Sequence, residues 1–271
     1  MIRFTHALAA ACAFTLAAPA SAQETTAELP RQLSWTAYDT GSAGYNQAVA
    51  IGAALQDALG VNLRVLPGKN DVSRTEPLRQ GRVQFSATGV GGSFMAQEGV
   101  FTFGAENWGP QPVRVLMANN GGAINLAVGV AGDLGIETYA DLRGKRVAWV
   151  AGAPSLNVNT EAYLAYGGLT WDDVERVDFG GFGASWQGLV EGQVDAAFAS
   201  TNSGMAYEAA SSPRGLFWPP IDPENTEGLA RLLAVAPFFS PNKATVGATT
   251  DGTEFPGTIP DQKAIFTNGD D

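Results

Sequence analysis

Strands and helices alternate along the first part of the chain, and this alternation limits the possible folds more than any other feature of the sequence. Residues 33–38 alternate apolar and polar side chains, as a half-buried strand does. Residues 45–59 then place apolar side chains close to helical spacing. The pattern continues with a strand over 62–67, a helix over 74–80 closed by Gly81, and a strand over 83–88. This order predicts a parallel sheet with right-handed crossover helices, which binds ligands at the carboxyl ends of its strands.

A second set of alternating elements follows an irregular stretch over 101–112 and two apolar runs over 113–118 and 123–130. Its expected elements are a short helix over 139–143, a strand over 146–150, a helix over 157–166, a strand over 174–179, a helix over 184–191 and a strand over 194–199. The frame Leu-x-x-Gly-x-Val-polar occurs in both sets, at 78–84 and 189–195, where a helix closed by glycine leads into a strand. We therefore expect an α/β fold of two lobes, each a mainly parallel sheet flanked by helices, with a ligand cleft between the lobes.

The first residues carry the features of a signal peptide. Arg3 supplies a positive charge, residues 7–18 are mostly apolar, and Ala-Ser-Ala at 20–22 fits the cleavage pattern of small residues. The apolar run is too short to remain in a bilayer as a spanning helix. We expect export to the periplasm, removal of residues 1–22, and a mature chain that begins at Gln23.

The expected lobes follow from where the pattern of elements is interrupted. Residues 23–118 form the first lobe and residues 119–238 the second. The remaining residues, 239–271, are expected to return towards the first lobe.

Cleavage of the signal peptide removes the only cysteine, Cys12, and the only histidine, His6. Without these residue types, the mature chain has no ligands for a zinc site of the usual kind and no partners for a Cys–His pair or a Ser–His–Asp triad. We therefore expect no catalytic residues, no bound metal and no cofactor.

The chain is strongly acidic. Removal of Arg3 takes away one positive charge and no negative one, which changes the net charge from −11 to −12. Such a surface repels phosphate backbones, so nucleic acid is not an expected partner. An anionic small molecule is still possible, because oriented backbone N–H groups in a buried site act at much shorter range than the mean surface charge.

The stretch 36–45 joins the first strand to the first helix through a turn of glycine, serine, threonine and aspartate. Such a turn points free N–H groups and the positive end of a helix dipole at one place, which favours an anion. The stretch contains neither GxGxxG nor GxxxxGK[ST], which disfavours a dinucleotide site and a P-loop. Taken alone, it is equally compatible with an ordinary tight turn.

Several segments of the chain resemble known solute receptors. Residues 140–147, Ala-Asp-Leu-Arg-Gly-Lys-Arg-Val, resemble a segment shared by type II extracytoplasmic solute-binding proteins. Asn159, residues 168–174, residues 192–196 and the turn at 41–45 resemble more specifically the TAXI family of TRAP-transporter solute receptors. The resemblance extends from about residue 33 to about residue 260.

This resemblance implies a receptor that holds a small organic anion, namely a dicarboxylate, a 2-oxo acid or an acidic amino acid. The receptor would deliver its solute to a TRAP complex of one small and one large integral membrane protein. By position, the family's ligand contacts correspond to Gly41, Ser42, Tyr45, Thr88, Pro154, Ser155, Asn159 and Ser200.

The chain also departs from the family pattern. Arg74 stands where a small amide is common, and an arginine can pair with a carboxylate through two N–H groups. We add Arg74 to the expected ligand contacts, with a solvated arginine at a helix start as the alternative. Tyr45 stands alone where relatives often have two aromatic residues, and the segment 89–91 lacks the usual polar side chains. Relatives usually continue beyond the point where this chain stops, so we expect either a truncation or a first lobe completed in another way.

Each expected contact also has a purely structural interpretation. Tyr45 can be a core residue, Ser155 and Asn159 can cap helices, and Ser200 can satisfy the end of a strand. The functional alternatives are a receptor for an ABC importer or a sensor kinase, since type II lobes serve all three systems. An exported enzyme is a third possibility, which the loss of histidine and cysteine disfavours.

Overall fold

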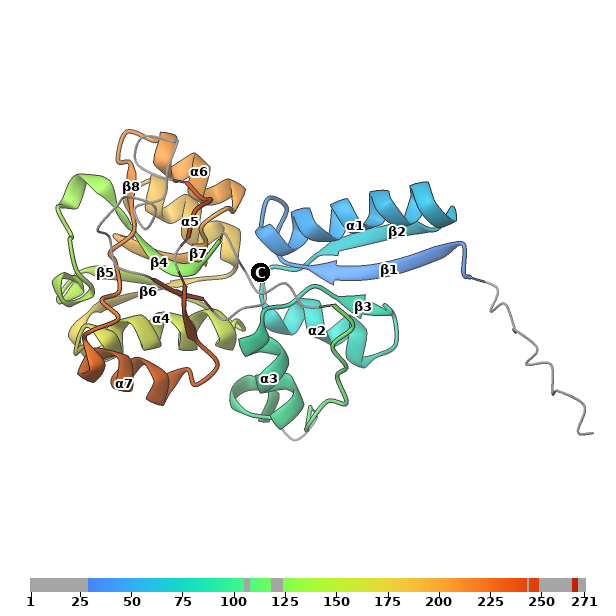
Figure 1. Cartoon of the computed structure of the whole chain (residues 1–271), viewed down its shortest axis with the longest axis horizontal. Coiled ribbons are helices and arrows are strands. Elements are labelled where there is room, and N and C mark those ends of the chain that lie inside the picture. Colours follow the sequence, from blue (N-terminus) through green and yellow to red (C-terminus); the bar gives the residue numbers. More distant parts are fainter. Residues whose placement is uncertain (1–28, 105–107, 118–123, 243, 249–264, 268–271) are drawn as a thin grey trace, which may run out of the picture. The chain divides into compact units, whose positions relative to one another are not determined.

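The computed structural model describes residues 29–104, 108–117, 124–242, 244–248 and 265–267 (Figure 1). The predicted signal peptide lies outside the described residues. The described residues from Arg31 onwards make one compact unit. Among the described helices, none is both long enough and apolar enough to span a membrane.

The first sheet has three parallel strands in the order β2-β1-β3. They are β1 (Gln32–Ala37), β2 (Asn62–Pro67) and β3 (Phe85–Ser86), connected by helices α1 (Ala43–Leu59) and α2 (Asp71–Arg79). The chain moves from β1 to one neighbour and then back across β1 to the other. Right-handed crossovers therefore place α1 and α2 on opposite faces of the sheet, as Figure 1 shows.

The second sheet has five strands in the order β6-β5-β7-β4-β8. They are β4 (Leu126–Ala131), β5 (Arg146–Val150), β6 (Glu175–Phe179), β7 (Ala196–Ser200) and β8 (Leu216–Phe217). Strand β5 is parallel to β6 and β7, whereas β4 is antiparallel to β7 and β8. Helices α4 (Pro154–Tyr166) and α5 (Phe182–Val190) connect β5 to β6 and β6 to β7. The α/β class predicted from the sequence is confirmed.

The remaining elements lie between and after these sheets. They are α3 (Val90–Glu98), α6 (Gly204–Ser211), α7 (Thr226–Val235), an antiparallel pair β9 (Ser240–Asn242) and β10 (Ile265–Thr267), and 3₁₀ turns at Phe101–Gly104, Gly132–Leu134, Tyr139–Leu142 and Trp171–Asp173. Most of the expected returning segment after residue 248 lies outside the described residues.

The same βαβαβ unit occurs twice, once as β1-α1-β2-α2-β3 and once as β5-α4-β6-α5-β7. We call residues 32–86 the first repeat and residues 146–200 the second repeat. The predicted frame marks equivalent positions in them, and Gly81 and Gly192 both have positive φ, at +67° and +76°. The two repeats also share backbone hydrogen bonds at this point. In the first repeat, Pro77 O accepts from Arg82 N at 2.8 Å and from Val83 N at 3.3 Å. In the second, Gly188 O accepts from Gln193 N at 2.8 Å and from Val194 N at 3.3 Å. The internal repeat expected from the sequence is confirmed.

Several predicted boundaries are wrong, mostly at helix starts. Helix α2 begins at Asp71 rather than 74, because Asn70 accepts a hydrogen bond from the Ser73 N–H and caps the helix. Helix α4 begins at Pro154 rather than 157, since proline is tolerated in a first turn, where its missing N–H has no intrahelical partner. Helices α1 and α5 each begin two residues earlier than predicted, at Ala43 and Phe182.

The predicted strand over 83–88 is also shorter than expected. Only Phe85–Ser86 of the predicted strand over 83–88 pairs with β1. The apolar run over 113–118 forms no strand in its described part, residues 113–117.

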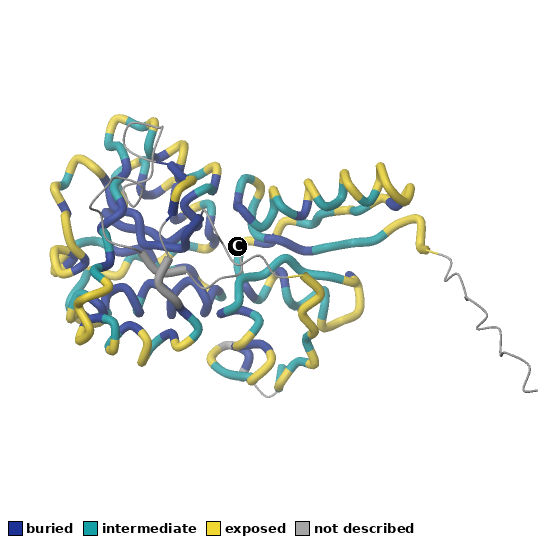
Figure 2. The backbone as a smooth tube through the Cα atoms, in the orientation of Figure 1, coloured by how far each residue is buried: buried dark blue, intermediate teal, exposed yellow. Residues whose placement is uncertain are grey.

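Most of the buried hydrophobic residues belong to the second sheet and its helices, where the tube in Figure 2 is mainly dark blue. The largest of them include Trp186, Trp218, Tyr163 and Leu164, all at most 1% exposed. A smaller cluster contains Met95, Ala96, Phe103 and Val158, which joins α3 to α4. The second sheet and its helices therefore contain most of the buried hydrophobic core.

Asp195, part of the segment that resembles solute receptors, has a structural role. Its carboxylate accepts hydrogen bonds from the backbone N–H of Arg146 at 3.0 Å and from Arg146 Nη2 at 2.6 Å, and Arg214 Nη2 lies 3.6 Å away. Burial alone raises the pKa of Asp195, but the hydrogen bonds from Arg146 and the charges of both arginines outweigh it, so its pKa lies below the usual value. This residue ties β5 to the start of β7.

Replacement of Asp195 tests this role through the pH dependence of stability. Because the pKa is lower in the folded state, the stabilisation is present above the unfolded pKa of about 3.9 and disappears as the pH falls through the folded pKa. We expect Asp195→Asn to lower the free energy of unfolding at pH 6 by about 1.5–3 kcal/mol, and by clearly less at pH 3, in urea titrations. Asp178→Asn is the control, because the Asp178–Arg176 pair is exposed and should contribute little at either pH. An equal loss for Asp195→Asn at both pH values would contradict the assignment.

Candidate functional site

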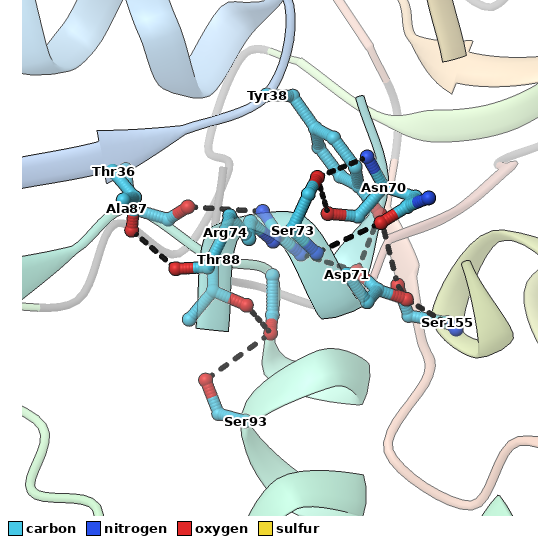
Figure 3. Close-up of polar contacts among 11 residues, drawn as sticks. Thr36, Tyr38, Asn70, Asp71, Ser73, Arg74, Ala87, Thr88, Ser93 and Ser155 are labelled. Carbon is cyan, nitrogen blue, oxygen red and sulfur yellow. Dashed lines mark hydrogen bonds and ion pairs between the residues drawn. The ribbon is translucent and has the colours of Figure 1, made fainter. Parts of the chain in front are cut away.

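Four polar side chains meet where the two repeats touch, and we call them the Asp71 cluster: Tyr38, Asp71, Arg74 and Ser155 (Figure 3). Tyr38 directly follows β1, Asp71 and Arg74 lie in the first turn of α2, and Ser155 is the second residue of α4. Asp71, Arg74 and Ser155 are 1%, 3% and 5% exposed. The cluster therefore joins the carboxyl ends of β1 and β2 to that of β5.

The Asp71 carboxylate is the centre of this cluster. One oxygen, Oδ1, accepts from Arg74 Nη2 at 2.8 Å and from the Tyr38 hydroxyl. The other, Oδ2, accepts from the Ser155 backbone N–H at 2.8 Å and from Ser155 Oγ at 2.6 Å. Burial, followed by the negative charge of Asp71, raises the pKa of Tyr38 well above its usual value, so Tyr38 stays protonated and donates. Such charge-assisted bonds are about twice as strong as neutral ones.

Arg74 is held tightly but is not fully satisfied. Its Nη1 donates to the Ala87 carbonyl at 2.9 Å, and its guanidinium lies 3.8 Å from the centre of the Tyr38 ring. Its Nε–H is buried and has no hydrogen-bond partner among the described residues. The alternative prediction, that Arg74 is a solvated arginine at a helix start, is wrong, because Arg74 is only 3% exposed. A buried donor without a partner costs about 1–3 kcal/mol, which a ligand acceptor would recover.

The first turn of α3 approaches the same region through two glycines. A methyl group at Gly92 would lie 2.9 Å from Thr88 Oγ1 and 3.2 Å from Arg74 Nη2. One at Gly91 would lie 3.0 Å from Phe238 Cζ and 3.5 Å from Asn159 Oδ1. Helix α3 has no side-chain cap, so its first N–H groups are free of side-chain acceptors and bring the positive end of the helix dipole close to Thr88 and Arg74. Asn159 is 4% exposed, and its Oδ1 has no partner among the described residues. The side chains here thus offer an uncommitted donor and an uncommitted acceptor.

Five of the predicted contacts lie at the starts of α2, α3 and α4. Arg74 and Ser155 belong to the Asp71 cluster, and Thr88 and Asn159 lie beside the first turn of α3. Pro154 is the buried first residue of α4.

The other four predicted contacts lie at the start of α1 and at the end of β7. Ser42 caps α1 by accepting from the N–H of Tyr45, which is half-buried. Gly41 has a φ of +91°, and its carbonyl accepts from Gly204 N at 2.9 Å. Ser200, the last residue of β7, donates to Asn202 Oδ1 at 2.8 Å, in the loop that leads to α6. The structure therefore divides the predicted residues into two groups.

Gly41 lines a hollow of about 260 Å³ between the start of α1 and the helices α5 and α6. Its other lining residues include Thr40, Gly183, Trp186, Met205 and Glu208. A second, more open hollow of about 540 Å³ lies beside α2 and is lined by Asn70, Val72, Ser73, Gly152 and Gly180, among others. Residues of the Asp71 cluster line neither hollow.

Sequence reasoning missed three residues at these contacts. Tyr38, Asp39 and Asp71 were not among the predicted contacts. In the structure, Asp39 Oδ2 accepts from Gly183 N at 2.9 Å, in the first turn of α5. An acidic residue in a first helical turn, as at Asp71, is a common feature of helices and gives no warning of a partner in another repeat.

The chemistry available at the Asp71 cluster follows from the types of its side chains and from their contacts. Among the described residues, no group of three or more His, Cys, Asp or Glu side chains could hold a metal. Ser155 Oγ donates to a carboxylate, and an Asp without a histidine is a poor base for activating a hydroxyl. The available chemistry is a set of directed hydrogen bonds and one guanidinium.

Comparison with known proteins shows one family. A family model described as NMT1/THI5 like matches residues 57–224, more than half of the 271 residues. No curated protein sequence matches the chain.

Solved structures give distant matches. The alkanesulfonate-binding protein SsuA from Xanthomonas axonopodis pv. citri, bound to MOPS, is 20% identical with a TM-score of 0.44, and the alignment covers 63% of this chain and 54% of that one. The periplasmic aliphatic sulphonate-binding protein SsuA from Escherichia coli is 18% identical with a TM-score of 0.45, covering 70% and 56%. An ancestral arginine-binding protein bound to arginine is 16% identical with a TM-score of 0.48, covering 77% and 92%. The chain thus spans little more than half the length of the two sulfonate-binding proteins.

The Asp71–Arg74 pair makes a testable contribution to stability. Arg74→Ala leaves a buried carboxylate without its cation, so we expect the free energy of unfolding to fall by about 3–5 kcal/mol in urea titrations. Adding Asp71→Asn to Arg74→Ala should restore part of this loss, because the uncompensated charge is then gone. Arg79→Ala is the control on the same helix, since the Arg79–Glu76 pair is far more exposed and should contribute little. A double variant no more stable than Arg74→Ala would contradict the pairing.

Proposed function

The chain belongs to the NMT1/THI5-like family, and we propose that it is an extracytoplasmic receptor that binds a small organic anion without changing it chemically. The family match and the resemblance of residues 140–147 to type II solute-binding proteins support a binding role. The repeated βαβαβ unit, with its loops at the carboxyl ends of the strands, is a suitable scaffold for such a site.

The observation that carries the proposal is Arg74, whose Nη2 lies close to the uncapped start of α3 and whose buried Nε–H has no partner among the described residues. A guanidinium and a helix N-terminus both favour negative charge, and both are strongest where water is excluded. The unpaired Asn159 Oδ1 nearby is an acceptor for a hydroxyl or ammonium group of the same solute. These groups fit a dicarboxylate, a 2-oxo acid or an acidic amino acid.

The remaining predicted contacts enter the proposal by their positions. Thr88, Pro154 and Ser155 adjoin Arg74 and Asn159, and we propose that they form the same binding site. Gly41, Ser42, Tyr45 and Ser200 would close on the solute from the loops after β1 and β7.

We propose that the receptor works in the periplasm and that its partner is a TRAP complex of a small and a large integral membrane subunit. This assignment rests on the resemblance of residues 168–174 and 192–196 to the TAXI family. An ABC importer or a sensor kinase is the alternative, because the type II resemblance is common to all three. Uptake of the solute into vesicles that requires an ion gradient would support the TRAP complex, whereas uptake that requires ATP would support the importer.

An exported enzyme is the second class of function. It would require turnover of a carboxylate substrate by the purified chain, and the side chains around Arg74 offer no paired nucleophile and base among the described residues. Incubation of the protein with the solute it releases, followed by product analysis, separates the two classes.

The central prediction concerns a solute identified by mass spectrometry of the small molecules that purified protein releases. Arg74→Lys keeps the charge but loses the Nε–H and the planar fork, so we expect calorimetry to show affinity for that solute reduced about tenfold or more. Arg64→Lys is the matched control, since Arg64 is exposed on β2 and should leave affinity unchanged. Equal affinity for wild type and Arg74→Lys, or release of a cation or a nucleotide, would reject the site.

A further inference from the structure

Equivalent helices of the two repeats are capped in different ways. In the first repeat, α1 and α2 carry their own caps, because Ser42 Oγ accepts from Tyr45 N at 3.2 Å and Asn70 Oδ1 accepts from Ser73 N at 2.8 Å. In the second repeat, α4 and α5 begin after Ala153 and Gly181, neither of which supplies a side-chain cap. The first N–H groups of α4 and α5 therefore need acceptors from elsewhere.

Both acceptors are carboxylates of the first repeat. Asp71 accepts from Ser155 N at 2.8 Å at the start of α4, and Asp39 accepts from Gly183 N at 2.9 Å at the start of α5. Backbone bonds accompany each contact, from Val72 N to Gly152 O at 3.2 Å and from Phe182 N to Lys69 O at 2.9 Å. The first repeat thus supplies negative groups to two helix starts of the second repeat.

The two contacts differ in what surrounds them. Asp71 is 1% exposed and is paired with Arg74, whose buried Nε–H has no partner among the described residues. Asp39 is half-buried, and no arginine among the described residues forms an ion pair with it. Only the contact of Asp71 combines a helix start with a guanidinium that still has a donor to offer, and that combination attracts a further anion.

We propose that the Asp71 carboxylate is an internal substitute for the anionic group of a solute, and that an anionic solute binds by displacing it from Arg74 and from the start of α4. This inference rests on the proposed function and identifies Asp71 as a residue that sets affinity and specificity. With Asp71 in place, the charge of Arg74 is already neutralised, so a solute gains little unless it takes over these donors. Because Asp71 is part of the same chain, it competes for these donors at a high effective concentration. Only an anion that makes several of the same hydrogen bonds can therefore displace it.

The experiment compares wild type, Asp71→Asn and Asp39→Asn, with 2-oxoglutarate and glutamate as probes. These two anions share a carbon skeleton and differ in a keto group against an ammonium group. Asp71→Asn removes the competing charge, so we expect both probes to bind about tenfold more tightly or better by calorimetry. Asp39→Asn removes a similar helix contact and leaves the Asp71–Arg74 pair intact, so we expect less than about a threefold change.

Tyr38→Phe is a second variant, which keeps the proposal testable if Asp71→Asn does not fold. It keeps the aromatic ring against Arg74 and removes only the hydroxyl that donates to Asp71. The carboxylate is then held less tightly, and both probes should bind about two- to tenfold more tightly. Unfolding in urea confirms that each variant is folded before binding is measured.

Several outcomes would overturn the proposal. If Asp71→Asn weakens the binding of glutamate but not of 2-oxoglutarate, Asp71 receives the solute's ammonium group and does not compete with its carboxylate. Unchanged or weaker binding of both probes by folded Asp71→Asn and Tyr38→Phe would also reject it, as would the absence of binding by every variant. The proposed function fails separately, if the purified protein releases no solute and binds no organic anion. If wild type and Asp71→Asn bind a solute with the same affinity, only the displacement of Asp71 by the solute is rejected, and the proposed binding function stands.

Discussion

The organisation of this protein depends on the hydrogen bond between the Asp71 carboxylate and the start of α4. Helix α4 has no side-chain cap of its own, and Asp71 is buried beside Arg74 with donors on both oxygens. A buried carboxylate is stable only when its donors are all in place, and an uncapped helix start needs an acceptor. The two requirements are met by the same contact, which ties α2 of the first repeat to α4 of the second. The contact of Asp39 with α5 repeats this solution at the other helix start.

The two repeats show how one local pattern produces both a scaffold and a site. In each repeat, a helix closed by glycine leads into the third strand. The polar side chain at the end of the frame then accepts a hydrogen bond from a backbone N–H of the first strand. Gln84 accepts from Ser34 N at 2.9 Å, and Asp195 accepts from Arg146 N at 3.0 Å. This part of the unit is the same in both repeats, because it forms the sheet. The repeats differ at the other end of the strands, where the helices begin and where parallel sheets present their loops. The differences in capping are thus concentrated where a solute would bind.

The parts of the fold that could be predicted are those set by local pattern. The strands Asn62–Pro67 and Arg146–Val150 and the internal frame were predicted as they occur, because periodicity and glycine position are local signals. The start of α4 was missed, because residues 151–156, rich in small residues, were predicted to form a loop, whereas the helix begins at Pro154. Arg74 was predicted because it departs from a family pattern, and Ser155 was predicted because its position matches that pattern. Asp71 could not be found this way, because its partner Ser155 is 84 residues away and only the tertiary structure brings them together.

The charge of the molecule is consistent with a site that works by exchange. A chain with a net charge of −11 gives a distant anion no general attraction, and the pair Asp71–Arg74 adds no net charge of its own. Selectivity must therefore come from bonds made at short range, where the Arg74 Nε–H and the start of α3 are directed donors. If the solute's anionic group replaces Asp71, the buried charge balance is unchanged, since one carboxylate leaves for solvent as another arrives. The exchange avoids burying an additional charge, and it allows the contact that joins the two repeats to depend on the solute.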